Sequence, residues 1–234
     1  MSENLTGLGR LRIEDERDLN YPVSTVLTPR RGVDFQYWNS HKWWGDQGST
    51  PFCVPYSWAH WLEDGPVFAG KARWRSTGGH VRGQFQGEQP GFDLDTGYNW
   101  MQQNDYWPGT DYDGTSVRAG AKYLVKKGFI KEYRWAWDAN TVVTAIMELG
   151  PVILGTMWYM DMFTPDSRYG RIEPSGSPAG GHAYIVNGVN VRTGWFRIKN
   201  SWGQAWGRNG HAYIKIEDLD YLIKDRGEAC IAIS

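Results

Sequence analysis

The chain contains 234 residues and carries a formal net charge of −1 at pH 7, with 25 Lys and Arg residues against 26 Asp and Glu residues. This length can bury a sizeable core and is typical of one domain, or of two lobes of one domain. The balanced charge gives no basic surface for nucleic acid and none for an anionic membrane. No apolar run approaches the roughly 20 residues that span a bilayer. We therefore expect neither nucleic acid nor membrane as a partner.

The N-terminal half predicts an arm followed by helices. Residues 1–32 have little periodicity and are expected to form an extended arm. A helix is predicted over 54–64, because Pro55 lies in its first turn and Gly65 follows its end. The glycine-rich stretch 78–97 is expected to be a loop. A capped helix is predicted over 115–128.

The C-terminal half predicts one more helix, over 139–149, and then mainly strands. Apolar runs predict strands at 152–157, 183–189 and 195–199, around Tyr213, and in the terminal segment that contains Cys230. A loop is expected at 175–181. Short strands separated by tight turns indicate an antiparallel, barrel-like sheet. The expected fold class is therefore α+β.

One of the two cysteines has the setting of a nucleophile. Cys53 follows turn residues and precedes the first predicted helix, so the helix N-terminus would favour its thiolate. Cys230 instead lies in an apolar strand and is interpreted as a core residue.

Two further motifs lie far downstream of Cys53. His182 stands in Gly181-His182-Ala183, and Asn200 stands in Lys199-Asn200-Ser201, 129 and 147 residues after Cys53. Adjacent strands would bring the imidazole and the amide together. His182 could then act as general base and acid, with Asn200 orienting it. Gln47, six residues before Cys53, could donate to an oxyanion together with the Cys53 backbone N–H.

These motifs, in this order and at these distances, resemble the papain-like cysteine peptidases (peptidase C1 family) from about Val33 to the C-terminus. The chain resembles bacterial or phage members without a full-length prosegment. The resemblance implies a catalytic domain at 33–234, with a helical lobe at about 45–134, a barrel-like lobe at about 135–234 and the active site in the cleft between them.

The resemblance also implies a substrate site, and Trp202 would in addition shield the bond between His182 and Asn200. Gly155, Gly180 and Ala183 match positions around the side chain of the second residue before the cleaved bond. All three are small, so a bulky apolar or aromatic side chain is expected there. The full set of expected substrate-binding residues is Gly114, Thr115, Gly155, Gly180, Gly181, Ala183 and Trp202.

The sequence departs from the family's pattern around the nucleophile. Thr50 stands where the usual signature has a second cysteine, Val54 where it has an aromatic residue and Pro51 where it has a glycine. None of these changes removes a group that the chemistry needs.

The expected function is a cysteine endopeptidase acting on peptides or proteins through a thioacyl intermediate at Cys53. Two alternatives stay open: a catalytically degenerate peptide-binding homologue, and a peptidase or transpeptidase directed at peptidoglycan. No cofactor and no metal site are expected. The polar N-terminus carries no signal-peptide pattern, so the expected location is the cytoplasm unless a non-classical route exports the chain. A protein inhibitor or activator is left open.

Overall fold

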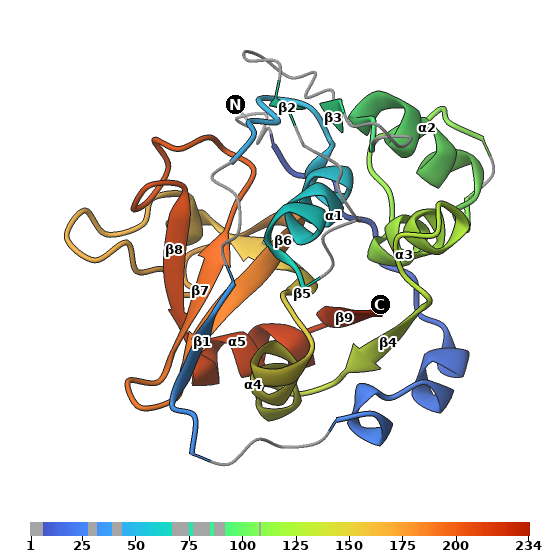
Figure 1. Cartoon of the computed structure of the whole chain (residues 1–234). Coiled ribbons are helices and arrows are strands. Elements are labelled where there is room, and N and C mark those ends of the chain that lie inside the picture. Colours follow the sequence, from blue (N-terminus) through green and yellow to red (C-terminus); the bar gives the residue numbers. More distant parts are fainter. Residues whose placement is uncertain are drawn as a thin grey trace.

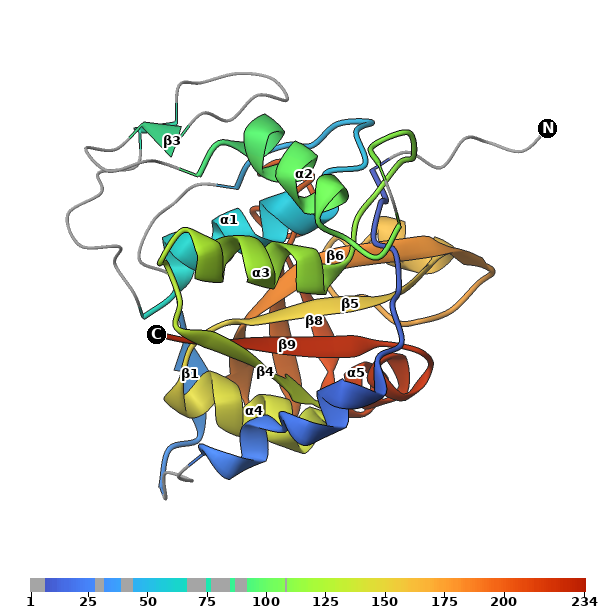
Figure 2. The same cartoon turned by 90° about the vertical axis from the view of Figure 1, so that its right-hand side faces the viewer.

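The fold is one large antiparallel sheet with helices on both of its faces (Figures 1 and 2). A computed structural model describes residues 7–27, 32–38, 44–66, 75–76, 85–86, 92–107 and 109–234. One face bears α1 (Cys53–Asp64), α2 (Leu94–Gln103) and α3 (Val117–Lys126). The opposite face bears α4 (Ala139–Glu148) and α5 (Ile216–Lys224). Three short 3-10 helices complete the helical elements: η1 (Glu16–Asn20), η2 (Val23–Thr25) and η3 (Met160–Phe163).

Seven strands form the main sheet in the order β4-β9-β5-β6-β7-β8, with β1 paired to β6. Because β4 and β8 lie at opposite ends of this order, the sheet is open and not closed into a barrel. The α+β class and the antiparallel sheet are thus confirmed, without barrel closure. The strands are β1 (Phe35–Tyr37), β4 (Glu132–Ala136), β5 (Val152–Tyr159), β6 (Pro178–Asn190), β7 (Trp195–Lys199), β8 (His211–Lys215) and β9 (Glu228–Ile233), while β2 (Arg75–Ser76) pairs with β3 (Phe85–Gln86) separately.

The central strands are apolar on both faces because successive side chains point to opposite sides of the sheet. Ile153 and Ile185 belong to the core beneath α1 and α3. Their neighbours Leu154 and Val186 belong to the core on the side of α4 and α5. This explains why β5 and β6 appear in the sequence as continuous apolar runs.

Helix α1 is buried over its whole length. It packs tightly against α3, where Gly120 allows the approach, since a Cβ at that position would lie 2.2 Å from Cδ1 of Trp58. The indole of Trp58 donates to the carbonyl of Val117 at 3.2 Å. The position of Cys53, the first residue of α1, is therefore set by tight packing along the helix.

A buried ion pair ties the other end of α1 to the sheet. Asp64, the last residue of α1, accepts from Nζ of Lys199 in β7 at 2.8 Å, and both side chains are fully buried. The second carboxylate oxygen accepts from Nδ2 of Asn187 at 2.7 Å, and Oδ1 of Asn187 accepts from Nε of Arg197 at 2.9 Å. Lys199 precedes Asn200, so this pair connects the helix of the predicted nucleophile to the strand that leads to Asn200.

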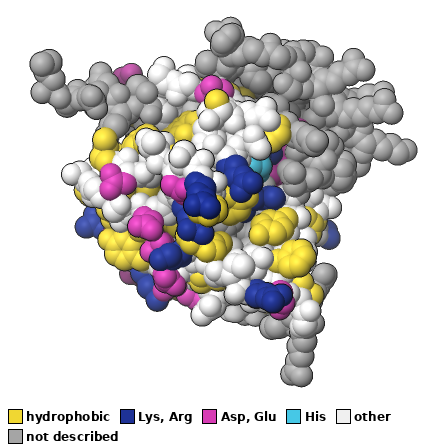
Figure 3. Space-filling model, turned by 90° about the vertical axis from the view of Figure 1, so that its left-hand side faces the viewer, with side chains coloured by type: hydrophobic (Ala, Val, Ile, Leu, Met, Phe, Trp, Pro, Cys, Tyr) yellow, Lys and Arg dark blue, Asp and Glu magenta, His cyan; other side chains and the backbone are white. Residues whose placement is uncertain are grey.

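Charged and aromatic side chains share the outer face of the sheet. Figure 3 shows the side of the molecule that bears β7 and β8, where Lys and Arg side chains gather beside hydrophobic ones. Arg171 lies 4.7 Å from the ring centroid of Trp195, and Arg197 lies 4.7 Å from that of Tyr37.

No helix in the described part of the chain is long and apolar enough to cross a membrane.

The predicted helices at 54–64, 115–128 and 139–149 correspond to α1, α3 and α4, and the predicted strands correspond to β5 to β9. Two expected loops are wrong in part. Residues 94–97 begin α2, whose first turn is capped by Oδ1 of Asp93 accepting from the Thr96 N–H at 2.6 Å. Residues 178–181 already belong to β6, because they pair with β5. Most of 78–91 lies outside the described residues, and the division into lobes at about residue 135 stays a prediction.

The arm is extended in its first described part and then turns into η1 and η2. The side chain of Asp15 caps η1, accepting from the Arg17 N–H at 3.0 Å. The sequence pattern did not predict these short helices, which need only one turn of hydrogen bonds.

Removing one partner of the buried ion pair should destabilise the fold strongly. We expect Lys199→Met to lower the free energy of unfolding by about 3–5 kcal/mol, because it leaves the Asp64 charge buried and unpaired. The matched control is Lys215→Met, which breaks an exposed contact to Glu217 and should cost less than about 1 kcal/mol. Urea unfolding followed by tryptophan fluorescence measures both. Equal costs for the two substitutions would contradict the role assigned to Lys199.

Candidate active site

Cys53 is the first residue of α1 and is fully buried. Burial raises the pKa of its thiol to about 12, although the nearby backbone N–H groups of Ala183 and Val54 act in the opposite direction. The thiol therefore lies beside the residue that follows His182, at a helix N-terminus. In the structure it is a neutral thiol, because water is excluded from it.

His182 and Asn200 meet across β6 and the end of β7. Nε2 of His182 lies 2.9 Å from Oδ1 of Asn200, and the same Oδ1 accepts from the Ser201 backbone N–H at 2.8 Å. Because a backbone N–H can only donate, this amide atom is the oxygen. Nε2 of His182 must then carry the proton. Nδ1 is left with its lone pair, and it has no hydrogen-bond partner among the described residues.

Aromatic rings enclose this imidazole. Trp202 stacks on His182 with centroids 4.8 Å apart, and Trp158 packs edge-on at 4.9 Å. Phe163 stacks in turn on Trp202 at 5.2 Å. Burial lowers the pKa of His182 to about 4, and the hydrogen bond to Asn200 opposes this only in part. The imidazole is therefore neutral in the structure and has its basic nitrogen free.

Gln47 is buried, and its amide orientation is fixed. Its Oε1 accepts from the Ser201 hydroxyl, and its Nε2 donates to the Thr50 carbonyl at 2.7 Å. A primary amide has two N–H donors, and the bond to the Thr50 carbonyl uses only one of those of Gln47. Ser201 thus contacts the side chains of both Asn200, through its N–H, and Gln47, through its hydroxyl.

Residues 7–11 of the N-terminal arm cover the site. The N–H groups of Gly9 and Arg10 donate to the Gly181 carbonyl at 3.2 and 3.1 Å. On the other side, the Thr115 N–H donates to the Gly9 carbonyl and the Leu11 N–H donates to the Thr115 carbonyl, both at 2.9 Å. Figure 2 shows this segment, in blue, passing the ends of β6, β5 and β9.

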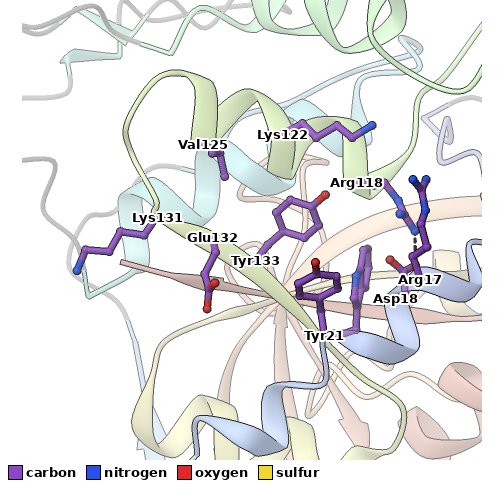
Figure 4. Close-up of a pocket in the computed structure, with 10 residues that line it drawn as sticks. Arg17, Asp18, Tyr21, Arg118, Lys122, Val125, Lys131, Glu132 and Tyr133 are labelled. Atoms are coloured by element: carbon purple, nitrogen blue, oxygen red, sulfur yellow. Dashed lines mark hydrogen bonds and ion pairs between the residues drawn. The ribbon is translucent and has the colours of Figure 1, made fainter.

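The arm is also anchored beyond residue 11. The guanidinium of Arg118 in α3 donates to Asp15 at 2.8 Å and forms a second ion pair with Asp18. Figure 4 shows Arg118 and Asp18 joined at the edge of a cavity of about 440 Å³ between the arm, α3 and β4. These ion pairs are largely buried, so removing one partner would leave an unpaired buried charge, which costs more than the loss of an exposed contact.

The predicted substrate-binding residues all surround the arm or the thiol. The arm bonds to Thr115 and Gly181, and the Gly7 carbonyl accepts from Nε1 of Trp202 at 3.2 Å. Ala183 lies beside Cys53. A Cβ on any of the remaining three would lie within 3 Å of an arm atom: Gly114 (2.4 Å, Gly9 carbonyl), Gly155 (2.8 Å, Nε of Arg10) and Gly180 (2.9 Å, Cδ1 of Leu8).

Three parts of the site were not predicted from the sequence. Ser201 carries a usable signal, because it follows Asn200 directly. Glu228, which binds Arg10 at 2.9 Å, had no motif around it. The arm residues 7–11 showed no periodicity that would place them in a cleft. Cys230 is fully buried in β9, where the sequence places it. No three acidic, His or Cys side chains of the described residues lie close enough together to hold a metal ion.

The chain has the fold of the papain-like cysteine peptidases. Within that fold, a cysteine begins a buried helix, and a histidine on β6 is hydrogen-bonded to the asparagine that follows β7. No protein-family model and no curated protein matches the sequence. The structure is similar to xylellain, a cysteine protease from Xylella fastidiosa, with a TM-score of 0.66, 17% identity, and coverage of 98% of this chain and 96% of that one.

Two further solved structures share the fold. The bromelain protease from Ananas comosus, in complex with the E64 inhibitor, has a TM-score of 0.56 at 10% identity over 86% of this chain and 99% of its own. Digestive procathepsin L 3 of Tenebrio molitor larval midgut has a TM-score of 0.51 at 17% identity over 88% of this chain and 71% of its own.

Displacing the arm should expose the Cys53 thiol. A Cβ on Gly9 would lie 2.3 Å from the Pro51 carbonyl oxygen, so Gly9→Ala cannot seat the arm as observed. We expect alkylation of Cys53 by iodoacetamide at pH 7 to accelerate by at least about tenfold, because hydration lowers the thiol pKa and the thiolate is the reactive form. Peptide mass mapping measures the rate. Ser24→Ala, an exposed change in η2, is the control, and an unchanged rate in Gly9→Ala would contradict the covering role of the arm.

The pH dependence of the same reaction should differ between the two forms. In the wild-type chain the thiol pKa of about 12 keeps Cys53 protonated, so its alkylation rate should rise up to at least pH 10 without a plateau. In Gly9→Ala the rate should level off at a lower pH, because the thiolate then forms at lower pH. A common midpoint for both chains, measured from pH 5 to 10, would show that the arm does not control the thiol.

Proposed function

We propose that the chain is a cysteine peptidase that hydrolyses peptide bonds within protein substrates through a thioester at Cys53. The observation that carries the proposal is the fixed tautomer of His182. Because Asn200 holds the proton on Nε2, Nδ1 is free to take a proton from a thiol. The Cys53 thiol lies beside Ala183, the next residue.

The first half of the reaction forms the acyl-enzyme. Once the arm has left, the Cys53 sulfur attacks the substrate carbonyl carbon, and its proton passes to Nδ1 of His182. The oxyanion accepts from the free N–H of Gln47 and from the Cys53 backbone N–H. The C–N bond then breaks, and the imidazolium gives its proton to the leaving amine.

The second half of the reaction hydrolyses the thioester and regenerates the Cys53 thiol. A water molecule gives a proton to Nδ1 of His182 and attacks the thioester carbon. The C–S bond breaks, the carboxylic acid leaves, and the proton returns to the Cys53 sulfur. Trp202 and Trp158 keep bulk water away from the bond between His182 and Asn200, which strengthens that bond.

A pair of cysteine variants tests the proposal. Hydrolysis of denatured casein by the Gly9→Ala chain should be abolished by Cys53→Ala and retained in Cys230→Ala, since Cys230 lies in the core of β9. Product analysis by mass spectrometry should show internal cleavage. Equal hydrolysis with and without Cys53, or none in any chain, would defeat the proposal. Cleavage of peptidoglycan cross-links but not of casein would favour the peptidoglycan-directed alternative.

Gln47 provides a second, quantitative test. We expect Gln47→Ala to lower kcat for casein-derived peptides by about 10²–10³ with little change in KM, because the lost donor acts on the oxyanion. Ser201→Ala should lower kcat less, since it loosens Gln47 without removing it. A purely structural role of Gln47 would instead lower the thermal midpoint and leave kcat per folded molecule unchanged.

A further inference from the structure

The arm buries one charged side chain against β5 and the start of β9. Arg10 is 7% exposed, and its Nε donates to Oε1 of Glu228 at 2.9 Å. Its Nη2 donates to the Arg226 carbonyl at 3.2 Å. The guanidinium thus meets two acceptors at the start of β9, and its planar fork of donors fits such an arrangement.

A glycine and a valine lie beside the ion pair of Arg10 and Glu228, and we call the space that the guanidinium fills the Arg10 pocket. A Cβ on Gly155 would lie 2.7 Å from Oε1 of Glu228, 2.8 Å from Nε of Arg10 and 2.9 Å from Cγ2 of Val117. Glycine at this position therefore makes room for the guanidinium and the carboxylate together. Gly155 is also one of the residues matched to the side-chain pocket for the second residue before the cleaved bond, so Arg10 occupies that pocket.

The carboxyl group of Glu228 has few other partners. Burial raises the pKa of Glu228, and the negative charge of Asp18 raises it further. The Arg10 guanidinium opposes this most strongly, and Arg118 opposes it less. Arg118 already binds Asp15 and Asp18, so it is not free to pair with Glu228. When the arm leaves, Glu228 loses its closest cation and keeps a poorly hydrated position at the end of the pocket.

We infer that Glu228 makes this pocket selective for a basic side chain, with arginine preferred over lysine, and that Arg10 of the arm occupies it as a built-in ligand. The inference rests on the proposed peptidase function, for which it names the substrate class. It replaces the apolar preference expected from Gly155, Gly180 and Ala183 alone, because those residues line the pocket without showing what lies at its end.

Arginine is favoured over lysine for a geometric reason. The two acceptors, Oε1 of Glu228 and the Arg226 carbonyl, each receive a different nitrogen of one guanidinium. A lysine ammonium is a single point charge and would reach one acceptor well. A leucine side chain would leave the carboxylate without a partner, which a buried charge tolerates poorly.

The arm itself allows a test that requires no turnover. In the full chain, the rate of Cys53 alkylation reports how firmly residues 7–11 fill the cleft. We expect Arg10→Lys to raise this rate modestly and Arg10→Leu to raise it by at least about tenfold, because only the cations pair with Glu228. An apolar pocket would give the reverse order, with Arg10→Leu as well protected as the wild type, and would overturn the inference.

Glu228 variants identify the partner. With Arg10 in place, Glu228→Gln should accelerate the alkylation of Cys53. In the Glu228→Gln background, Arg10→Leu should then change the alkylation rate much less than it does in the wild-type background. Glu217→Gln, on the exposed side of α5, is the matched control and should change neither rate. A difference that persists in Glu228→Gln would overturn the assignment. Thermal unfolding of each chain separates a released arm from a lost fold, since only the latter also speeds alkylation of Cys230.

Peptide selectivity then extends the test to substrates. In the Gly9→Ala chain, fluorogenic peptides that differ only at the second residue before the cleaved bond should rank arginine, lysine, leucine and glutamate in falling kcat/KM. Glu228→Gln should reduce the ratio of arginine to leucine by at least about tenfold. Hydrolysis with an unchanged ratio would overturn the selectivity and leave the peptidase standing. No hydrolysis, together with the expected alkylation order, would overturn the peptidase and leave the pocket assignment standing.

Discussion

The geometry of the candidate active site depends on how α1 is fixed to the sheet. The helix carries Cys53 at its first residue and Asp64 at its last, and the buried pair of Asp64 with Lys199 holds the far end against β7. A helix fixed at only one end could turn about its contact with α3. With both ends fixed, the thiol, the imidazole on β6 and the amide after β7 keep one relative position. Catalytic groups need such fixed placement, because small displacements weaken proton transfer and attack.

Burial acts on the same site in two opposite ways. In the covered state it makes both Cys53 and His182 neutral, since it raises the thiol pKa and lowers that of the imidazole. The proposed peptidase reaction needs a thiolate, which a helix N-terminus and an imidazolium favour only when the charges are hydrated or paired. If the arm blocks access to the thiol, as the proposed function requires, we expect it to have a second effect. By excluding water, it should also shift the proton distribution toward the neutral, unreactive pair.

Much of the candidate site could be proposed from the sequence because its residues lie in short local patterns. Cys53 is marked by the helix that follows it, and His182 and Asn200 lie in strands whose pairing follows from their apolar runs. Helix α2 was missed because Gly97 and polar residues obscure its period, while its cap at Asp93 depends on a local hydrogen bond. The open sheet could not be predicted either, since the alternation of strands and turns is the same in an open sheet and in a barrel.

The contact of Arg10 with Glu228 shows where local patterns stop being informative. The two residues are 218 positions apart, and neither stands in a motif. Their pairing arises because an arm without regular structure crosses the sheet at the point where β9 begins and Gly155 leaves space. Small residues around a pocket indicate how wide it is. Which substrate side chain the pocket prefers depends on the chemical group at its closed end. A single carboxylate there outweighs the apolar walls, because an unpaired buried charge costs more than the loss of a few apolar contacts. The same carboxylate then links two properties of the chain, since the arm and a basic substrate side chain compete for one partner.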